Sequence, residues 1–203
     1  MAFIAGFLLL IVISVVFIFK YKHFDSAIFS FAKEHTTPGN TRLMRVISFL
    51  GNHVFLIPAN FLLLLLFILI KERLWAIRVT VISLSSLIMM SVLKNLFQRQ
   101  RPDDPMIDGI VNFGFPSGHG MMAVVFYGLV AGWIAVSIHN IWYRRTTIVF
   151  LILLVLLIGY SRIYLRVHYA TDVLAGYCMG MIWLTFCLWS VKQFNNLRLT
   201  NKN

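Results

Sequence analysis

Long apolar runs, free of charged residues except for Arg78 near one end of the third, dominate this chain, and short polar segments separate them. Each run is close to the roughly 20 residues that an α-helix needs to cross a bilayer. Strands of a membrane barrel would alternate apolar and polar residues, and these runs do not. Because lipid admits only helices and closed barrels as spanning forms, the pattern predicts transmembrane helices. The six predicted spans are Met1–Phe19, Val54–Ile70, Trp75–Leu93, Gly120–Ile138, Thr146–Ser161 and Val173–Val191.

The segment between the first two runs, residues 20–53, is amphipathic instead of uniformly apolar. Apolar residues recur at helical spacing after Phe24, and the run Pro38-Gly39-Asn40 indicates a turn. We expect Thr41 to cap a second short helix after that turn. The segment therefore predicts interfacial helices, which either flank a substrate entrance or simply pack on the end of the bundle.

Composition agrees with a membrane protein. The chain is 60% hydrophobic and 12% charged, whereas a globular domain is about half apolar and roughly a quarter charged. We predict an all-α, six-transmembrane-helix bundle with short interfacial helices in the first loop, and residues 1–203 form a single integral membrane domain. Cys178 and Cys187 are nine residues apart in one apolar run, on opposite sides of a helix, so they predict no disulfide.

The net charge of +11 indicates an anionic partner. Nucleic acid is disfavoured, because the basic residues interrupt apolar runs and form no long soluble face. Anionic lipid head groups or an internal phosphate site account for the charge better. An even number of spans puts both termini on one side, and basic residues in the short loops of that side favour a cytoplasmic location.

Ionisable residues gather at the ends of the predicted spans. Lys94 closes the third span, His119 opens the fourth, Arg162 follows the fifth and Asp172 opens the sixth. Alternating spans place all of them on one membrane face, opposite to the termini. Anchoring of charged side chains at the interface is the simpler alternative, but it explains a matched set of cations, histidines and an acid poorly.

Three motifs contain these residues. The first, residues 94–102, has Lys94 and Arg101 about two helical turns apart before Pro102. The second, residues 116–119, combines Ser117 and Gly118 at a helix start, where backbone N–H groups cradle phosphate. The third, residues 161–172, contains Arg162, with His168 and Asp172 at a spacing that shares a helix face. A carboxylate there can hold one imidazole nitrogen and leave the other free to attack.

In this order the three motifs resemble the signature of the type-2 phosphatidic acid phosphatase superfamily. Its bacterial members include phosphatases of phosphatidylglycerophosphate and of undecaprenyl diphosphate. Many members carry Ser or Thr where this chain has Gly120, which affects a secondary contact. The resemblance implies a membrane lipid phosphatase of the bacterial inner membrane, with its active site on the extracytoplasmic face.

The resemblance also implies a role for each motif residue. His168 forms a phosphohistidine, Asp172 orients it, and His119 protonates the leaving oxygen and then activates water. The phosphoryl oxygens are held by Lys94, Arg101, Ser117, Gly118 and Arg162. Three fixed cations replace Mg²⁺, so no metal and no other cofactor is expected. We interpret Asp103, Asp104 and Asp108 as a solvated loop and not as metal ligands.

Other interpretations remain open. A phosphotransferase on the same scaffold would pass the phosphoryl group from His168 to a hydroxyl instead of water. A transporter of anionic lipids is disfavoured, because the chain has no internal repeat. Arg99 and Arg166 either contact a head group or anchor the interface. Expected partners are the lipid phosphate and the bilayer, with no obligate protein partner; phosphatidic acid, phosphatidylglycerophosphate, undecaprenyl diphosphate and lipid A phosphates are all candidate substrates.

Overall fold

A computed structural model describes residues 2–19, 23–107, 109 and 112–200, with side chains up to residue 194. Every regular element within these ranges is helical, which confirms the predicted all-α fold. Eight α-helices and one π-helical segment, η1, follow each other along the described chain: α1 (Ala2–Ile13), η1 (Ser14–Ile18), α2 (His23–Glu34), α3 (Pro38–Phe49), α4 (His53–Leu69), α5 (Arg73–Phe97), α6 (Gly118–Ser137), α7 (Ile141–Tyr164) and α8 (Ala170–Thr200).

Four of these helices are long and apolar enough to cross a membrane: α5, α6, α7 and the part of α8 over Ala170–Phe194. Two bent pairs raise the number to six if each pair counts as one span. In one pair, α1–η1 meets α2 at 94°; in the other, α3 meets α4 at 40°. The protein is therefore an integral membrane protein with four to six candidate spans.

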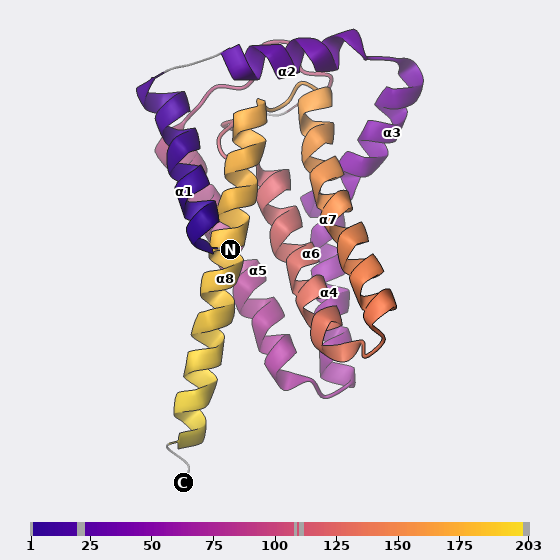
Figure 1. The fold of residues 1–203 in the computed structure, drawn as a ribbon, viewed down its shortest axis with the longest axis vertical. Coiled ribbons are helices and arrows are strands. Elements are labelled where there is room, and N and C mark those ends of the chain that lie inside the picture. Colours follow the sequence, from indigo (N-terminus) through magenta and orange to yellow (C-terminus); the bar gives the residue numbers. More distant parts are fainter. Residues whose placement is uncertain (1, 20–22, 108, 110–111, 201–203) are drawn as a thin grey trace.

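Helix α6 occupies the middle of the bundle, where it packs against α8, α7, α5 and α4 (Figure 1). Its contact with α8 is close because two glycines of α8 face it. A Cβ atom at Gly176 would lie 2.6 Å from the carbonyl oxygen of Ser117, and one at Gly180 would lie 2.9 Å from that of Met121. Small residues four apart allow two membrane helices to approach in this way.

Helices α2 and α3 lie in residues 20–53, where the sequence predicts short amphipathic helices. Helix α2 lies across the end of the bundle and α3 descends beside α7 (Figure 1). The predicted cap is wrong: Thr37, not Thr41, is the N-cap of α3, and its hydroxyl accepts a hydrogen bond from the Asn40 N–H at 3.3 Å. Pro38 begins the helix because its fixed φ suits the first helical position. The hydroxyl of Thr41 donates to the Thr37 carbonyl instead.

Candidate active site

The first motif places two cations near each other by means of a helix end followed by a loop. Helix α5 ends at Phe97, and Gln98 adopts a left-handed conformation with φ of 45°. Arg101 therefore lies beyond the helix, which corrects the expectation that both cations share one helix. Lys94, in the last turn, donates to the carbonyl of Phe113. The Arg101 guanidinium donates to backbone carbonyls, among them Val167 at 2.6 Å, so the loop fixes its direction.

The second motif begins helix α6. Ser117 is the N-cap, and its buried hydroxyl accepts from the Gly120 N–H at 3.4 Å. The Ser117 N–H donates to the Asp172 carbonyl at 2.9 Å, which joins the starts of α6 and α8. Gly118 and His119 follow in the first turn and line a cavity. Within the described part of the chain, the buried Nε2 of His119 has no hydrogen-bond partner, so it is free for a ligand.

The third motif supplies a buried arginine and a histidine. Arg162, in the last turn of α7, is 4% exposed and donates to the hydroxyl of Ser48 in α3. His168 lies in the turn before α8, so it does not share a helix with Asp172 as we expected. One oxygen of Asp172, Oδ2, accepts from the Tyr169 N–H at 2.9 Å and lies 3.6 Å from Nδ1 of His168. The carboxylate thereby faces the imidazole from the side opposite to Arg101.

The other imidazole nitrogen of His168, Nε2, lies 3.1 Å from a guanidinium nitrogen of Arg101. Arginine has only donors, so Nε2 is the acceptor and carries a lone pair. Burial lowers the pKa of His168 well below its ordinary value, and the positive charges of Arg101, Arg162 and Lys94 lower it further. At neutral pH the imidazole is therefore uncharged and nucleophilic.

These elements surround a cavity of about 620 Å³. Six of the eight residues singled out from the sequence line it: Lys94, Arg101, Gly118, His119, Arg162 and His168. The other two, Ser117 and Asp172, are fully buried behind the wall. Three cations and three histidines, the third being His53, surround one space and form a site for a polyanion such as a phosphate group.

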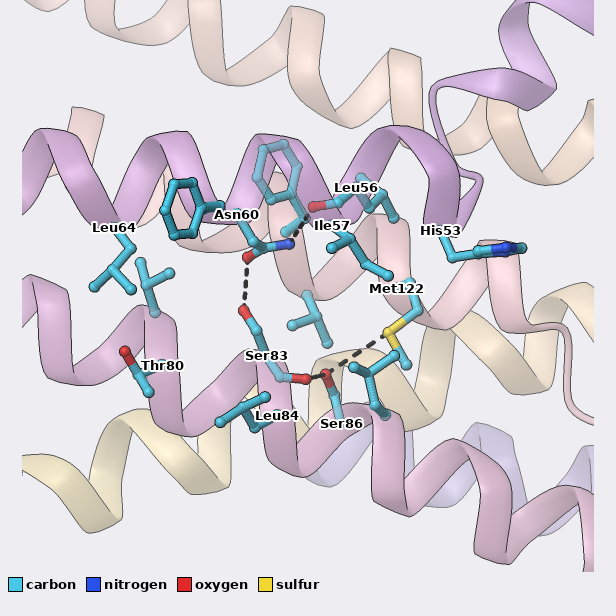
Figure 2. Close-up of a pocket in the computed structure, with 15 residues that line it drawn as sticks. His53, Leu56, Ile57, Asn60, Leu64, Thr80, Ser83, Leu84, Ser86 and Met122 are labelled. Carbon is cyan, nitrogen blue, oxygen red and sulfur yellow. Dashed lines mark hydrogen bonds between the residues drawn. The ribbon is translucent and has the colours of Figure 1, made fainter.

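A second, apolar groove adjoins this cavity between helices α4 and α5, with α6 behind (Figure 2). Its volume is about 280 Å³, and His53, Leu87 and Met122 line both spaces. A hydrogen bond of 2.6 Å from Ser83 to Asn60 joins the two helices across the groove. Apolar residues make up most of the remaining lining, so a hydrocarbon chain can continue from the cavity into the groove.

The two other arginines singled out from the sequence, Arg166 and Arg99, both form ion pairs. Arg166 forms an ion pair with Asp104 at 2.6 Å, and Arg99 bridges Asp172 and Asp25. Neither arginine lines the cavity. Asp108 lies outside the described residues. Within the part of the chain that the structure describes, no three His, Cys, Asp or Glu side chains gather as metal ligands do.

Sequence reasoning did not single out Ser48 and Asp25, which hold Arg162 and Arg99. Ser48 gives no signal, because a serine in an amphipathic helix is unremarkable. Asp25 gives one: it stands three and seven residues before Ile28 and Ala32, on the apolar face of α2. An acid on an apolar face is buried only when it has a partner, which would have indicated a buried cation.

Fold and cavity together define a class of protein: a helical membrane protein with a cationic, histidine-containing cavity next to an apolar groove. The PAP2 superfamily profile matches residues 74–196, and the chain belongs to that superfamily. The resemblance carried by the three motifs is thus confirmed.

One curated relative and two solved structures are similar to this chain in sequence or fold. The chain is 36% identical over 93 residues to phosphatidylglycerophosphatase B of Bacillus subtilis (strain 168), and this match covers 45% of each protein. The matched part therefore spans less than half the length of that relative. A crystal structure of a transmembrane PAP2 type phosphatidylglycerolphosphate phosphatase from Bacillus subtilis matches with a TM-score of 0.85 at 24% identity, covering 96% of both chains. The structure of Aquifex aeolicus LpxE matches with a TM-score of 0.62 at 26% identity, covering 80% of this chain and 93% of that one.

Proposed function

We propose that this protein is a membrane lipid phosphatase that hydrolyses a phosphomonoester or diphosphate of a lipid through a phosphohistidine at His168, without a metal ion. The observation that carries the proposal is the convergence of His168, His119 and three cations on one cavity, next to an apolar groove. A phosphate group fits the cavity and a lipid tail fits the groove. Membership of the PAP2 superfamily supports the same reaction class.

In the first step Nε2 of His168 attacks phosphorus, a P–N bond forms, and the bond from phosphorus to the lipid oxygen breaks. His119 donates a proton to that oxygen. In the second step a water molecule attacks the phosphohistidine, His119 takes its proton, and inorganic phosphate leaves. Asp172 stabilises the positive charge that the imidazole acquires in the first step.

The three cations stabilise the negative charge that spreads over the phosphoryl oxygens in the transition state. Arg162 and Arg101 are held in place by Ser48 and by backbone carbonyls, so they need little reorganisation. The Gly118 N–H at the start of α6 adds a donor. Ser117 is the N-cap of α6 and holds this helix start in place. Its hydroxyl would have to move away from the Gly120 N–H to contact the phosphate directly.

We further propose that each bent helix pair contributes one span, α1–η1 in the first pair and α4 in the second, with α2 and α3 at the interface. This gives six spans in the bacterial inner membrane. Cytoplasmic termini and an extracytoplasmic active site follow from the distribution of basic residues. Phosphatidylglycerophosphate, phosphatidic acid and undecaprenyl diphosphate are the substrates to compare. The name of the relative from Bacillus subtilis makes phosphatidylglycerophosphate the first to test.

The decisive experiment measures phosphate release by detergent-purified protein from this panel of lipids, in the presence of EDTA. We expect release by the wild type and its loss in His168→Ala. A matched control is His139→Ala, which removes an exposed histidine from the loop between α6 and α7 and should leave release unchanged. Release that requires a divalent metal, or that survives in His168→Ala, would refute the mechanism.

Phosphoryl transfer to a hydroxyl acceptor is the second candidate, because the same phosphohistidine can react with an alcohol in place of water. A phosphotransferase would release no free phosphate when the lipid phosphate is the only substrate. It would transfer a labelled phosphoryl group to an acceptor lipid or sugar when one is added.

A further inference from the structure

Arg99 forms ion pairs with two carboxylates that are far apart in the sequence, those of Asp25 and Asp172. Its guanidinium lies 2.5 Å from Oδ1 of Asp172 and 2.8 Å from Oδ2 of Asp25. Both carboxylates are buried, with side-chain exposures of 0% and 3%. A charge removed from water in this way is retained only when it is paired, so the three side chains form one electrostatic unit.

Asp25 also accepts two hydrogen bonds from the start of helix α8. Its Oδ1 accepts from the Thr171 N–H at 3.0 Å, and its Oδ2 accepts from the Thr171 hydroxyl at 2.7 Å. The same hydroxyl accepts from Arg99 at 2.7 Å. Thr171 is the residue before Asp172, so Asp25 fixes both the backbone that carries the Asp172 carboxylate and the cation that this carboxylate contacts.

The two oxygens of Asp172 have separate partners as a result. Oδ1 faces Arg99, whereas Oδ2 faces the Tyr169 N–H and Nδ1 of His168. Arg99 additionally lies over the ring of Tyr169, with 4.6 Å from Cζ to the ring centroid. Rotation of the Asp172 carboxylate away from His168 would break its ion pair with Arg99, so this ion pair restricts the rotation.

The balance of charge matters as much as the geometry. Two carboxylates and one guanidinium carry formal charges that sum to −1. Asp25 therefore takes up part of the positive charge of Arg99, and Asp172 keeps negative charge for the imidazole. Without Asp25, Arg99 would neutralise Asp172 alone and weaken its attraction for a protonated His168.

We propose that Asp25 of α2 is a positioning residue for catalysis, which acts through Arg99 and Thr171 to hold the Asp172 carboxylate behind His168. The interfacial helix α2 is then part of the catalytic apparatus and not only a cover of the bundle. This inference rests on the proposed phosphohistidine mechanism, since it assigns Asp25 a role in the reactivity of His168.

The test compares Asp25→Asn with the wild type in kcat, KM and pH profile. The variant keeps the shape of the side chain and removes its charge. We expect kcat to fall about 10- to 100-fold, by analogy with the carboxylates that orient metal-ligating histidines, with KM within about twofold. Asp104→Asn is the matched control, because it also breaks an Asp–Arg ion pair, between residues that do not line the cavity, and it should retain wild-type kcat.

The pH profile separates positioning from folding. Asp172 and the cations Arg101, Arg162 and Lys94 face His168, and His119 lies across the cavity. Removal of the negative charge of Asp25 makes these surroundings more positive, so the acid limb of kcat should move to lower pH in Asp25→Asn. Arg99→Gln removes a positive charge, so its acid limb should move to higher pH. A purely structural role would lower the amount of active protein without moving either limb.

Wild-type kcat and an unmoved acid limb in a folded Asp25→Asn variant would overturn the inference. If that variant does not fold, Arg99→Lys serves instead, because an ammonium group cannot bridge both carboxylates as the fork of arginine does; wild-type kcat in Arg99→Lys would overturn the inference equally. Failure of the wild type itself to release phosphate would instead refute the proposed function.

Discussion

Nδ1 of His168 lies 3.6 Å from Oδ2 of Asp172, across the turn that leads into helix α8. That oxygen also accepts the Tyr169 N–H, so one carboxylate both shapes the turn and faces the imidazole. Contraction of this distance by less than 1 Å would produce a hydrogen bond. A charge that develops on the imidazole during attack would favour such a contraction, because hydrogen bonds between charged groups are shorter.

Asp172→Asn should therefore abolish most of the activity while the protein still folds. The amide keeps an acceptor for Arg99 but provides no negative charge for the imidazolium. By analogy with other histidine–carboxylate pairs we expect kcat to fall roughly 10³- to 10⁴-fold. Steady-state kinetics on the best lipid substrate would measure this, with Asp103→Asn in the exposed loop as control. A loss of less than about tenfold would show that His168 does not depend on Asp172.

The low pKa of His168 predicts activity on the acidic side of pH 6.5. Burial and then the charges of Arg101, Arg162 and Lys94 favour the neutral imidazole. The nucleophile therefore stays deprotonated at a pH where a free histidine is already charged, and the acid limb of kcat/KM should lie well below 6.5. An acid limb at or above pH 6.5 in the wild type would contradict this assignment.

The same shift makes stability depend on pH in a defined direction. Below pH 6.5 the unfolded chain binds a proton at residue 168 that the folded protein does not bind. The contribution of His168 to the free energy of unfolding is therefore fully retained above pH 6.5 and decreases as the pH falls below that value. Thermal unfolding in detergent between pH 7 and pH 5 should show a smaller decrease of Tm for His168→Ala than for the wild type.

The apolar groove predicts a selective effect on long-chain substrates. Leu87 lines both the phosphate cavity and the groove, so Leu87→Trp would block the passage between them. We expect KM for long-chain lipids to rise about tenfold, which corresponds to the lost burial of roughly two methylene groups. KM for a short-chain, water-soluble phosphate should not change.

Leu96→Trp is the matched control for this prediction. Leu96 is also in α5 and is 70% exposed, but it lines neither space. An equal rise of KM for short and long substrates in Leu87→Trp, or a rise in Leu96→Trp, would exclude the groove as the place of the lipid tail.

Much of this architecture follows from local sequence, and the differences have physical causes. Helical spans are readable because apolar runs are long and uniform. Helix boundaries are harder to predict. Either Thr37, which precedes Pro38, or Thr41 could cap α3, and the helix begins at Pro38 because the fixed φ of proline suits the first helical position. His168 lies outside α8 because the helix begins only at Ala170, where the Asp172 carboxylate in the first turn accepts the Tyr169 N–H.

The partners of the motif residues could not be predicted in the same way. Ser48 meets Arg162 across 114 positions of sequence, and Asp25 meets Thr171 across 146. Such pairs depend on how α2 and α3 fold over the bundle, and amphipathic periodicity gives only the face that each helix buries. Motifs specify the groups that bind phosphate, whereas tertiary packing specifies what holds them.

The contact between α6 and α8 makes Gly176 sensitive to a single added methyl group. A Cβ atom there would lie 2.6 Å from the Ser117 carbonyl oxygen and 3.2 Å from the Met121 nitrogen. Both are backbone atoms, so the helices must separate, and overpacking of this kind costs about 1–3 kcal/mol. Separation would also strain the hydrogen bond from the Ser117 N–H to the Asp172 carbonyl. We therefore expect Gly176→Ala to lower both Tm in detergent and kcat. Gly6→Ala is the control, because nothing lies within 4 Å of a Cβ atom at Gly6 and alanine favours a helix; a Gly176→Ala protein as stable and active as Gly6→Ala would mean that α6 and α8 adapt without loss.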